Sequence, residues 1–408
     1  MNILVFFAPS RLCERSFWPL TCCWVIAVIL TIKCATSVLA AEADKPAEPK
    51  PSSAAAAPPY AESTDESDQY NVETLLTGLD NPCAIVVRPG ATTAAAYELY
   101  LSESGAGQVL RLKSDDLKTP TPIVTGIPVD SYGDAKKDEP EYRIGPLGLV
   151  FLTPTKLAVG GAGLPQGEDL VVVFSLPADG SAIKYDQQDY AVGPIPKGAQ
   201  STSGEGNFYG LAKTDDALFV TSNGDDDQAW ILKADLKANK LADLQPFIAT
   251  KPLLGTTGPT AVTVNPKEQS HYLVVSQMSG FKKDRDSLLT FYSPKSGKVA
   301  LNQETGLYDI AGLAYSPSDQ LYAVDVVRAD ATLGGIYRLD AVEVDGQQTT
   351  RAVKIAAAER PTALVFAPDG AMYVTALGPR QAPDSQPTGV LLKIIPKAAA
   401  ENGQKNTF

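Results

Sequence analysis

The densest cluster of acidic side chains in the sequence is NGDDDQ at residues 223–228. Carboxylate and amide oxygens are the ligands that Ca²⁺ prefers in proteins. The candidate metal ligands are therefore Asp225, Asp226 and Asp227. A calcium-binding loop spaces its acids at alternate positions, whereas these three are adjacent, so the other interpretation is a solvated surface turn. Ca²⁺ is the one cofactor for which the sequence offers ligands.

Histidine, the residue that most often acts as a general acid or base, occurs only at position 271, within NPKEQSHY. It lies in a polar turn between two apolar runs, and this position excludes Ser-His-Asp catalysis and a multi-histidine zinc site. The sequence also lacks a phosphate-binding glycine loop, a CxxC pair and a G-x-S-x-G nucleophile turn. We therefore assign no catalytic residue, and the sequence favours a protein that is not an enzyme.

The elements that must position any site follow an internal repeat. The unit PTALVFAPDGAMYV at residues 361–374 joins two apolar runs through a Pro-Asp-Gly turn, and similar units begin at residues 82, 146, 208, 259 and 310. The last three intervals are equal, at 51 residues. A period of about 40–50 residues is typical of β-propellers and of some helical arrays, so the content of each unit decides between them.

Each unit consists of short apolar runs with the length and turn signals of β-strands. Second and third runs such as YELYLSE and QVLRLK recur in every unit, and a fourth follows in the first five. The sixth unit lacks its fourth run, and YNVETLLTG at residues 70–78 supplies one from the other end of the chain. We predict an all-β fold, a six-bladed β-propeller over residues 70–396 with four strands per blade. The N-terminal strand 70–78 completes the last blade, which removes the unpaired sheet edges.

Ring closure assigns the loops to the two ends of the disc. Turns such as APDG lie at one end and are short, whereas the long loops 130–145, 193–207 and 376–388 gather at the other. Binding residues tend to lie on long loops held by a rigid scaffold. Candidate ligand-binding residues are those just before the innermost strands, at the channel mouth on this end: Asn81, Arg143, Asn207, Asp309 and Arg360. The alternative is that they are solvated rim residues, because a fold alone does not imply a site.

The two ends of the sequence differ in composition from the repeats. Residues 1–40 have the basic flank, apolar core and small-residue site of a secretory signal peptide, although an uncleaved anchor is the alternative. Residues 41–69 read as a disordered Ala/Pro-rich linker, and residues 397–408 as a disordered tail. We expect an exported protein, periplasmic or extracellular, with no membrane span in the mature chain. Four of the five cysteines lie in residues 1–40, so the mature chain would keep only Cys83. Cys83 lies in an apolar run and is predicted to be a buried, inert thiol.

Charge narrows the range of partners. The formal net charge is −12 and the sequence pI is near 4.7. A nucleic-acid partner is excluded because phosphate backbones select surfaces rich in Lys and Arg. We expect a monomer whose partner is a small molecule or a protein.

The run LLTGLDNPCAIVVRPG…YELYLSESGAGQVLRL, residues 75–112, resembles the opening blade of the secreted ScyD/ScyE-like propellers, named for proteins encoded in scytonemin biosynthesis clusters. More broadly, the repeats are similar to NHL and gluconolactonase-type six-bladed propellers. The gluconolactonase-type resemblance implies a divalent metal held by Asn or Asp immediately before the Gly of the innermost strands. Here Tyr209 and Ala311 occupy those positions, and Asn207 and Asp309 are displaced from them by two residues.

Two functional hypotheses follow. The first is an exported, non-catalytic propeller that binds a small ligand or a protein partner through its long-loop face. The alternative is a metal-dependent, Ca-type hydrolase or lactonase with Asn81, Asn207 and Asp309 around an ion in the central channel.

Overall fold

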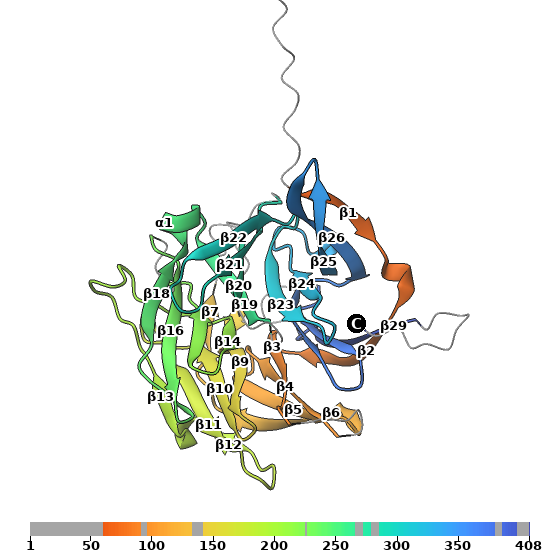
Figure 1. Cartoon of the computed structure of the whole chain (residues 1–408). Helices are drawn as coiled ribbons and strands as arrows, with labels where there is room; N and C mark the ends of the chain where they lie inside the picture. The colour runs from red at the N-terminus through yellow and green to blue at the C-terminus, as the bar shows by residue number, and fades with distance from the viewer. Residues whose placement is uncertain are drawn as a thin grey trace, which may run out of the picture. The chain divides into compact units, whose positions relative to one another are not determined.

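The computed structural model describes residues 60–90, 96–132, 142–224, 227–265, 272–278, 285–379, 386–397 and 408. The described residues form a six-bladed β-propeller and one separate two-stranded hairpin. In Figure 1 the innermost strands, among them β3, β9, β14, β19 and β23, gather around a common centre. No helix in these ranges is long and apolar enough to span a membrane. The predicted fold class is confirmed.

Blades 1 to 3 follow one another along the chain and are given from the channel outward. Blade 1 contains β3 (Pro82–Val87), β4 (Glu98–Glu103), β5 (Gln108–Lys113) and β6 (Asp116–Thr125). Blade 2 contains β9 (Pro146–Thr153), β10 (Lys156–Gly161), β11 (Val171–Ser175) and β13 (Tyr190–Val192). Blade 3 contains β14 (Leu211–Lys213), β15 (Ala217–Thr221), β16 (Trp230–Lys237) and β18 (Gln245–Ala249).

Blades 4 to 6 repeat the same order. Blade 4 contains β19 (Gly258–Val264), β20 (Leu273–Met278), β21 (Leu288–Tyr292) and β22 (Val299–Glu304). Blade 5 contains β23 (Ile310–Tyr315), β24 (Leu321–Asp325), β25 (Gly335–Val344) and β26 (Gln347–Ala357). Blade 6 contains β27 (Pro361–Phe366), β28 (Met372–Ala376), β29 (Gly389–Pro396) and, as its outermost strand, β2 (Tyr70–Leu79).

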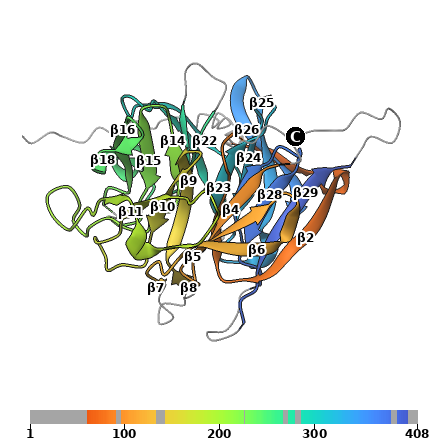
Figure 2. The same cartoon turned by 90° about the horizontal axis from the view of Figure 1, so that it is seen from below.

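Short elements lie between and beside the blades. The hairpin of β7 (Asp130–Tyr132) and β8 (Tyr142–Ile144) projects from one end of the disc, as Figure 2 shows. The others are η1 (Ser67–Gln69), β12 (Ile183–Lys184), η3 (Tyr185–Gln187), β17 (Lys240–Leu241), α1 (Thr250–Leu254) and η4 (Ala331–Leu333).

The ring closes through the N-terminal strand, as predicted. β2 pairs antiparallel with β29, from Tyr70 opposite Pro396 to Leu79 opposite Gly389. The predicted linker, however, ends earlier than residue 69. β1 (Ala61–Asp65) pairs parallel with β26 of blade 5, with Ala61 opposite Arg351. Its sequence AESTD carries no apolar run, so its strand conformation comes from the free backbone edge of the long strand β26.

The predicted disordered tail also needs correction at its two described residues. The backbone N–H of Lys397 donates to the carbonyl of Gln69 at 2.7 Å, and Phe408 is buried. The remainder of the tail and residues 1–59, which include the predicted signal peptide and most of the linker, lie outside the described residues.

The hydrophobic core is divided among the junctions between neighbouring blades. One cluster joins blades 2 and 3 through residues such as Val171 and Leu218, and another joins blades 6 and 1 through Tyr373 and Leu99. Strands covered by a blade on each face are buried along their whole length, as β15 is. This is why the second runs read as continuous apolar stretches rather than as alternating patterns.

Hydroxyl side chains at the second strand tie several blades to their neighbours close to the channel. Ser102 donates to the carbonyl of Leu147 at 2.7 Å, and Thr221 donates to that of Thr260 at 2.7 Å. Ser276 similarly bonds blade 4 to the carbonyl of Ile310, at 3.0 Å. At the junction of blades 6 and 1, Thr362 of the innermost strand donates to Pro82 at 2.7 Å. In blade 5 the equivalent of Ser276 is Val324, which has no hydroxyl.

Candidate functional site

The long-loop end of the channel opens into a cavity of about 400 Å³, here called the mouth cavity. It lies where the chain enters the innermost strands and where it leaves the second strands. Its polar lining residues include Asn81, Tyr142, Arg143, Asn207, Asn223, Thr257 and Arg328. The apolar lining includes Leu147, Pro259, Met278, Val326 and Leu377. A polar rim over an apolar floor is the usual arrangement of a small-molecule site.

Three of the five predicted ligand-binding residues share one backbone conformation. Asn81, Asn207 and Arg360 have φ angles of 50°, 52° and 54°, all in the left-handed region. Asparagine adopts this region more readily than most residues do. The same turn therefore brings the chain to the channel in blades 1, 3 and 6.

Asn81 and Arg143, both predicted from the sequence, line the mouth cavity and contact each other. The Nδ2 of Asn81 donates to the carbonyl oxygen of Arg143 at 3.0 Å. The Nη1 of Arg143 lies 3.3 Å from Oδ2 of Asp80, and the arginine side chain is 63% exposed. Burial raises the pKa of Asp80, and the charge of Arg143 partly counteracts that rise. Asp80 thus holds the guanidinium from behind while the group remains accessible from the cavity.

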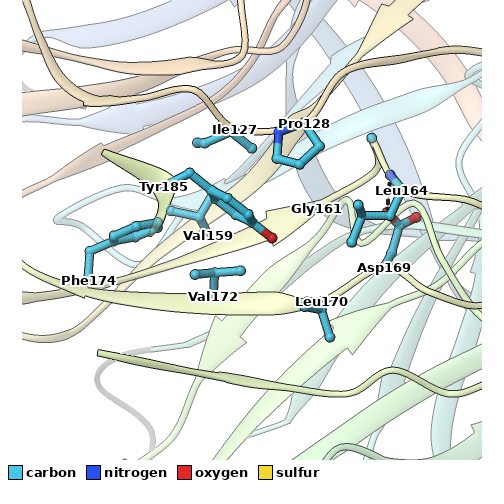
Figure 3. Close-up of a pocket in the computed structure, with 11 residues that line it drawn as sticks. Ile127, Pro128, Val159, Gly161, Leu164, Asp169, Leu170, Val172, Phe174 and Tyr185 are labelled. Carbon is cyan, nitrogen blue, oxygen red and sulfur yellow. Dashed lines mark hydrogen bonds between the residues drawn. The ribbon is translucent and has the colours of Figure 1, made fainter. Parts of the chain in front are cut away.

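Asn207, the third predicted residue in the cavity, is held by a buried carboxylate. Asp169 Oδ2 accepts from the backbone N–H of Asn207 at 3.0 Å, and Oδ1 accepts from that of Leu164 at 3.0 Å. Burial raises the pKa of Asp169 despite these bonds. Figure 3 shows Asp169 and Tyr185 on the wall of a small void of about 10 Å³ beside the site. This void is at the lower limit for holding one water molecule, so it is too small to bind a ligand.

Asp309, predicted to face the channel mouth, does not line the cavity. Its carboxylate is buried and accepts from the backbone N–H of Arg328 at 2.8 Å and from Nη2 of the same residue at 2.9 Å. The guanidinium of Arg328 lines the cavity in its place. The sequence carried one signal for Arg328, its position in the long loop 325–335, but the residue does not precede an innermost strand.

Arg360 also lies behind the cavity wall. It is 7% exposed, and its Nε and Nη2 donate to the carbonyls of Gly378 and Pro379 at 2.7 and 2.6 Å. Its guanidinium carbon lies 6.0 Å from the ring centre of Tyr142, a cavity residue that sequence reasoning missed. Arg360 thus contacts the wall rather than the space inside it.

A tyrosine separates the mouth cavity from the opposite end of the channel. Tyr209 donates to the carbonyl oxygen of Thr362 across the channel at 2.9 Å. Beyond it lies a second space of about 300 Å³, here called the far cavity, and both residues line both spaces. Burial raises the pKa of the Tyr209 phenol well above its ordinary value. It also raises the pKa of Cys83, which lies beside Tyr209 on the floor, to about 12.

The predicted calcium ligands fall only partly within the described residues. Asp225 and Asp226 lie outside them, as does His271. Asp227 is exposed, and its carboxylate lies 3.7 Å from the Nζ of Lys251. Among the residues that the structure describes, no three His, Cys, Asp or Glu side chains cluster closely enough to hold a metal ion. The calcium site stays a prediction.

Known proteins share the fold of this chain. No protein-family model matches it, and no curated protein matches it. A Thermus thermophilus protein assigned as an oxidoreductase (glucose dehydrogenase) has a TM-score of 0.52 and 15% identity, over 80% of this chain and 100% of that one. The α-L-arabinofuranosidase Arb93A of Fusarium graminearum has a TM-score of 0.51 and 10% identity, over 80% of this chain and 98% of that one. At these identities the likenesses show the propeller fold alone.

Proposed function

We propose that this protein is an exported, non-catalytic propeller that binds a small anionic ligand with an apolar body in the mouth cavity. One observation carries the proposal. Two guanidinium groups, Arg143 and Arg328, line the cavity, and no Asp or Glu is present among its described lining residues. In a chain of net charge −12, the charged side chains that line the cavity are thus both cationic, and their carboxylate partners Asp80 and Asp309 lie behind the lining.

The chemistry of the rim fits a carboxylate or a similar planar anion. A guanidinium offers five N–H donors in a fixed fork, and this geometry matches two anionic oxygens. The contact of Arg143 with Asp80 uses one of its donors, at 3.3 Å. The amides of Asn81 and Asn207 add neutral donors and acceptors to the same rim. The apolar floor would cover the rest of the ligand.

Cys83 and Tyr209, on the floor of the cavity, are not activated as nucleophiles, and this favours binding over catalysis. The Cys83 thiol has a pKa of about 12, and the pKa of Tyr209 is raised well above its ordinary value. Both groups therefore stay protonated at neutral pH, and a protonated thiol or phenol is a weak nucleophile. The alternative, a Ca-type hydrolase, is less well supported because Asp309, one of its three ligands, is already bonded to Arg328.

Export and family are part of the same proposal. The N-terminal signal sequence supports a periplasmic or extracellular location, and the blade signature in residues 75–112 supports a place among the ScyD/ScyE-like propellers.

A pair of fluorescent probes tests the binding proposal. The anion 8-anilinonaphthalene-1-sulfonate and the neutral N-phenyl-1-naphthylamine share an apolar body and differ in charge. We expect the anion to bind in the mouth cavity, and Arg143→Gln to weaken it by about tenfold or more, because a charge-assisted hydrogen bond contributes about 1.5–3 kcal/mol. Binding of the neutral probe to Arg143→Gln should match its binding to wild type.

Arg88→Gln is the matched control for this experiment. Arg88 also pairs with a carboxylate, that of Glu98 at 2.8 Å, but it follows the far end of β3. Its loss should leave the affinity for the anion unchanged. Equal affinities for the two probes, or equal losses in the two variants, would contradict the proposal.

A further inference from the structure

We infer that the junction of blades 5 and 6 contains a binding slot for an aromatic side chain, that Phe408 of the chain itself occupies it, and that this contact holds the ring closed. The inference is independent of the mouth cavity and of the proposed function.

Phe408 is enclosed by three rings from three different strands. Its ring lies 5.6 Å from Tyr70 of β2 in a stacked arrangement, with an interplanar angle of 17°. It meets Tyr322 of β24 and Phe366 of β27 edge-on, at 5.6 and 5.2 Å. These are the separations and angles that aromatic pairs favour. The side chain is only 6% exposed, and Figure 1 places the C-terminus close to β2, β24 and β29.

The three rings come from blade 5, from the innermost strand of blade 6 and from the N-terminal strand that closes the ring inside blade 6. Tyr322 belongs to blade 5 and Phe366 to blade 6, while Tyr70 begins the N-terminal strand that completes blade 6. Phe408 therefore links the closing strand β2 to blade 5 and to the innermost strand of blade 6. An aromatic side chain at this point stabilises the closure more than one packed against a single blade.

This junction lacks a contact that several others have. Val324 stands where Ser276 in blade 4 bonds to the next blade, so the hydroxyl link is missing here, as it also is at Gly160 of blade 2. The N-terminal segment crosses the same junction from outside, with β1 on blade 5 and β2 on blade 6. Between them, Glu66 accepts from Nη1 of Arg338 in blade 5 at 2.9 Å. Phe408 contacts this segment through its stacked ring contact with Tyr70.

The slot should bind an aromatic side chain that is supplied in trans once its own occupant is removed. The test uses the full-length chain carrying Phe408→Ala and the peptide acetyl-GQKNTF-amide, which copies residues 403–408. Both ends of the peptide are blocked, so the side chain and not a terminal charge is tested. The comparison peptide is acetyl-GQKNTA-amide.

We expect Phe408→Ala to lower the melting temperature by roughly 3–6 °C, since removal of a buried Phe is among the costlier truncations. Calorimetry should show the Phe peptide binding to Phe408→Ala at least about tenfold more tightly than the Ala peptide. The wild-type chain, whose slot is filled, should bind neither. Tyr272→Ala serves as the control variant, because Tyr272 makes one edge-on contact with Phe291, in blade 4. It should bind neither peptide.

Three results would overturn the inference. The first is an unchanged melting temperature for Phe408→Ala. The second is equal affinity of that variant for the two peptides. The third is binding of the Phe peptide by the wild-type chain or by Tyr272→Ala as tightly as by Phe408→Ala, which would place the peptide elsewhere.

Discussion

The two ends of the central channel are formed by the same six innermost strands, yet they differ in chemistry. The far cavity is lined by strand residues such as Ala84, Gly148 and Val262, and Lys213 is the one charged side chain among its described lining residues. The mouth cavity is lined in part by residues outside the blade strands, including Arg143 of the β7–β8 hairpin, Arg328 and three asparagines. The repeat thus supplies the channel, and the irregular loops supply its recognition groups.

Two ion pairs, one at each end of the channel, differ in burial. At the mouth, Asp309 is buried and bonded to Arg328. At the far end, the pair of Arg88 and Glu98 is partly open to solvent. Because solvent screens the more exposed pair, these two pairs should respond differently when one partner is removed.

The largest effect expected is that of Asp309→Ala. The substitution leaves the Arg328 guanidinium, which is 18% exposed, without its main partner. Breaking a buried pair from one side costs about 3 kcal/mol of folding free energy or more. Urea denaturation should show this loss, whereas Glu98→Ala at the far end should cost less than about 1 kcal/mol. Similar losses for the two variants would contradict the expected difference between the two pairs.

A smaller effect is expected from pH, with opposite signs at the two ends. At the mouth, burial raises the pKa of Asp325 to about 6, although its carboxylate accepts from the N–H groups of Tyr308 and Asp309 at 3.0 and 2.7 Å. The folded chain then keeps a proton that the unfolded chain, with a pKa near 3.9, has released. Asp325 should therefore remove about 2 kcal/mol of stability as pH rises from about 4 to 6. Asp325→Asn should remove this contribution, which urea midpoints across that range would measure.

Asp369, in a turn at the far end of the channel, should give stability the opposite dependence on pH. Burial alone would raise the pKa of Asp369. Hydrogen bonds from the side chain of Lys393 at 2.8 Å, the backbone N–H of Ala371 and the hydroxyl of Tyr373 together outweigh burial, so the pKa is lowered overall. The stability that the Asp369 carboxylate contributes should be present above its pKa in the unfolded chain and should be lost as pH falls below that value. A midpoint difference between wild type and Asp369→Asn that grows on acidification below pH 4 would contradict this assignment.

The smallest effect concerns the left-handed turns, which occur at both ends. Asn207 at the mouth and Asp319 in a far-end turn have φ angles of 52° and 67°. Alanine at either position should cost about 1 kcal/mol, because the short polar side chains of Asn and Asp can hydrogen-bond locally in the left-handed region and alanine cannot. Only Asn207→Ala should also weaken binding of the anionic probe, by a few-fold, and Asn207→Gly should restore stability but not binding. An equal change in probe affinity for Asp319→Ala would show that the effect is not specific to the mouth.

Most of the fold could be predicted because its signals are local. Apolar runs, Pro-Asp-Gly turns and a repeat interval identify strands without knowledge of their partners, and the missing fourth strand of the last unit pointed to residues 70–78. β1 could not be found in this way, since AESTD is polar and becomes a strand only against the edge of β26. Phe408 likewise lies in a polar tail, and its burial depends on three rings distant in sequence.

The sequence by itself determined the six-bladed ring, its closing strand and the end of the channel at which long loops gather, because each of these depends on periodicity and loop length. It also placed Asn81, Arg143 and Asn207 at the mouth. Only the tertiary structure decided that Arg328 rather than Asp309 lines the cavity and that Arg360 supports Tyr142 from behind. Position before a strand does not fix the direction of a side chain. That direction follows from the left-handed turns and from bonds such as the one between Asp309 and Arg328, which form only when the loops meet.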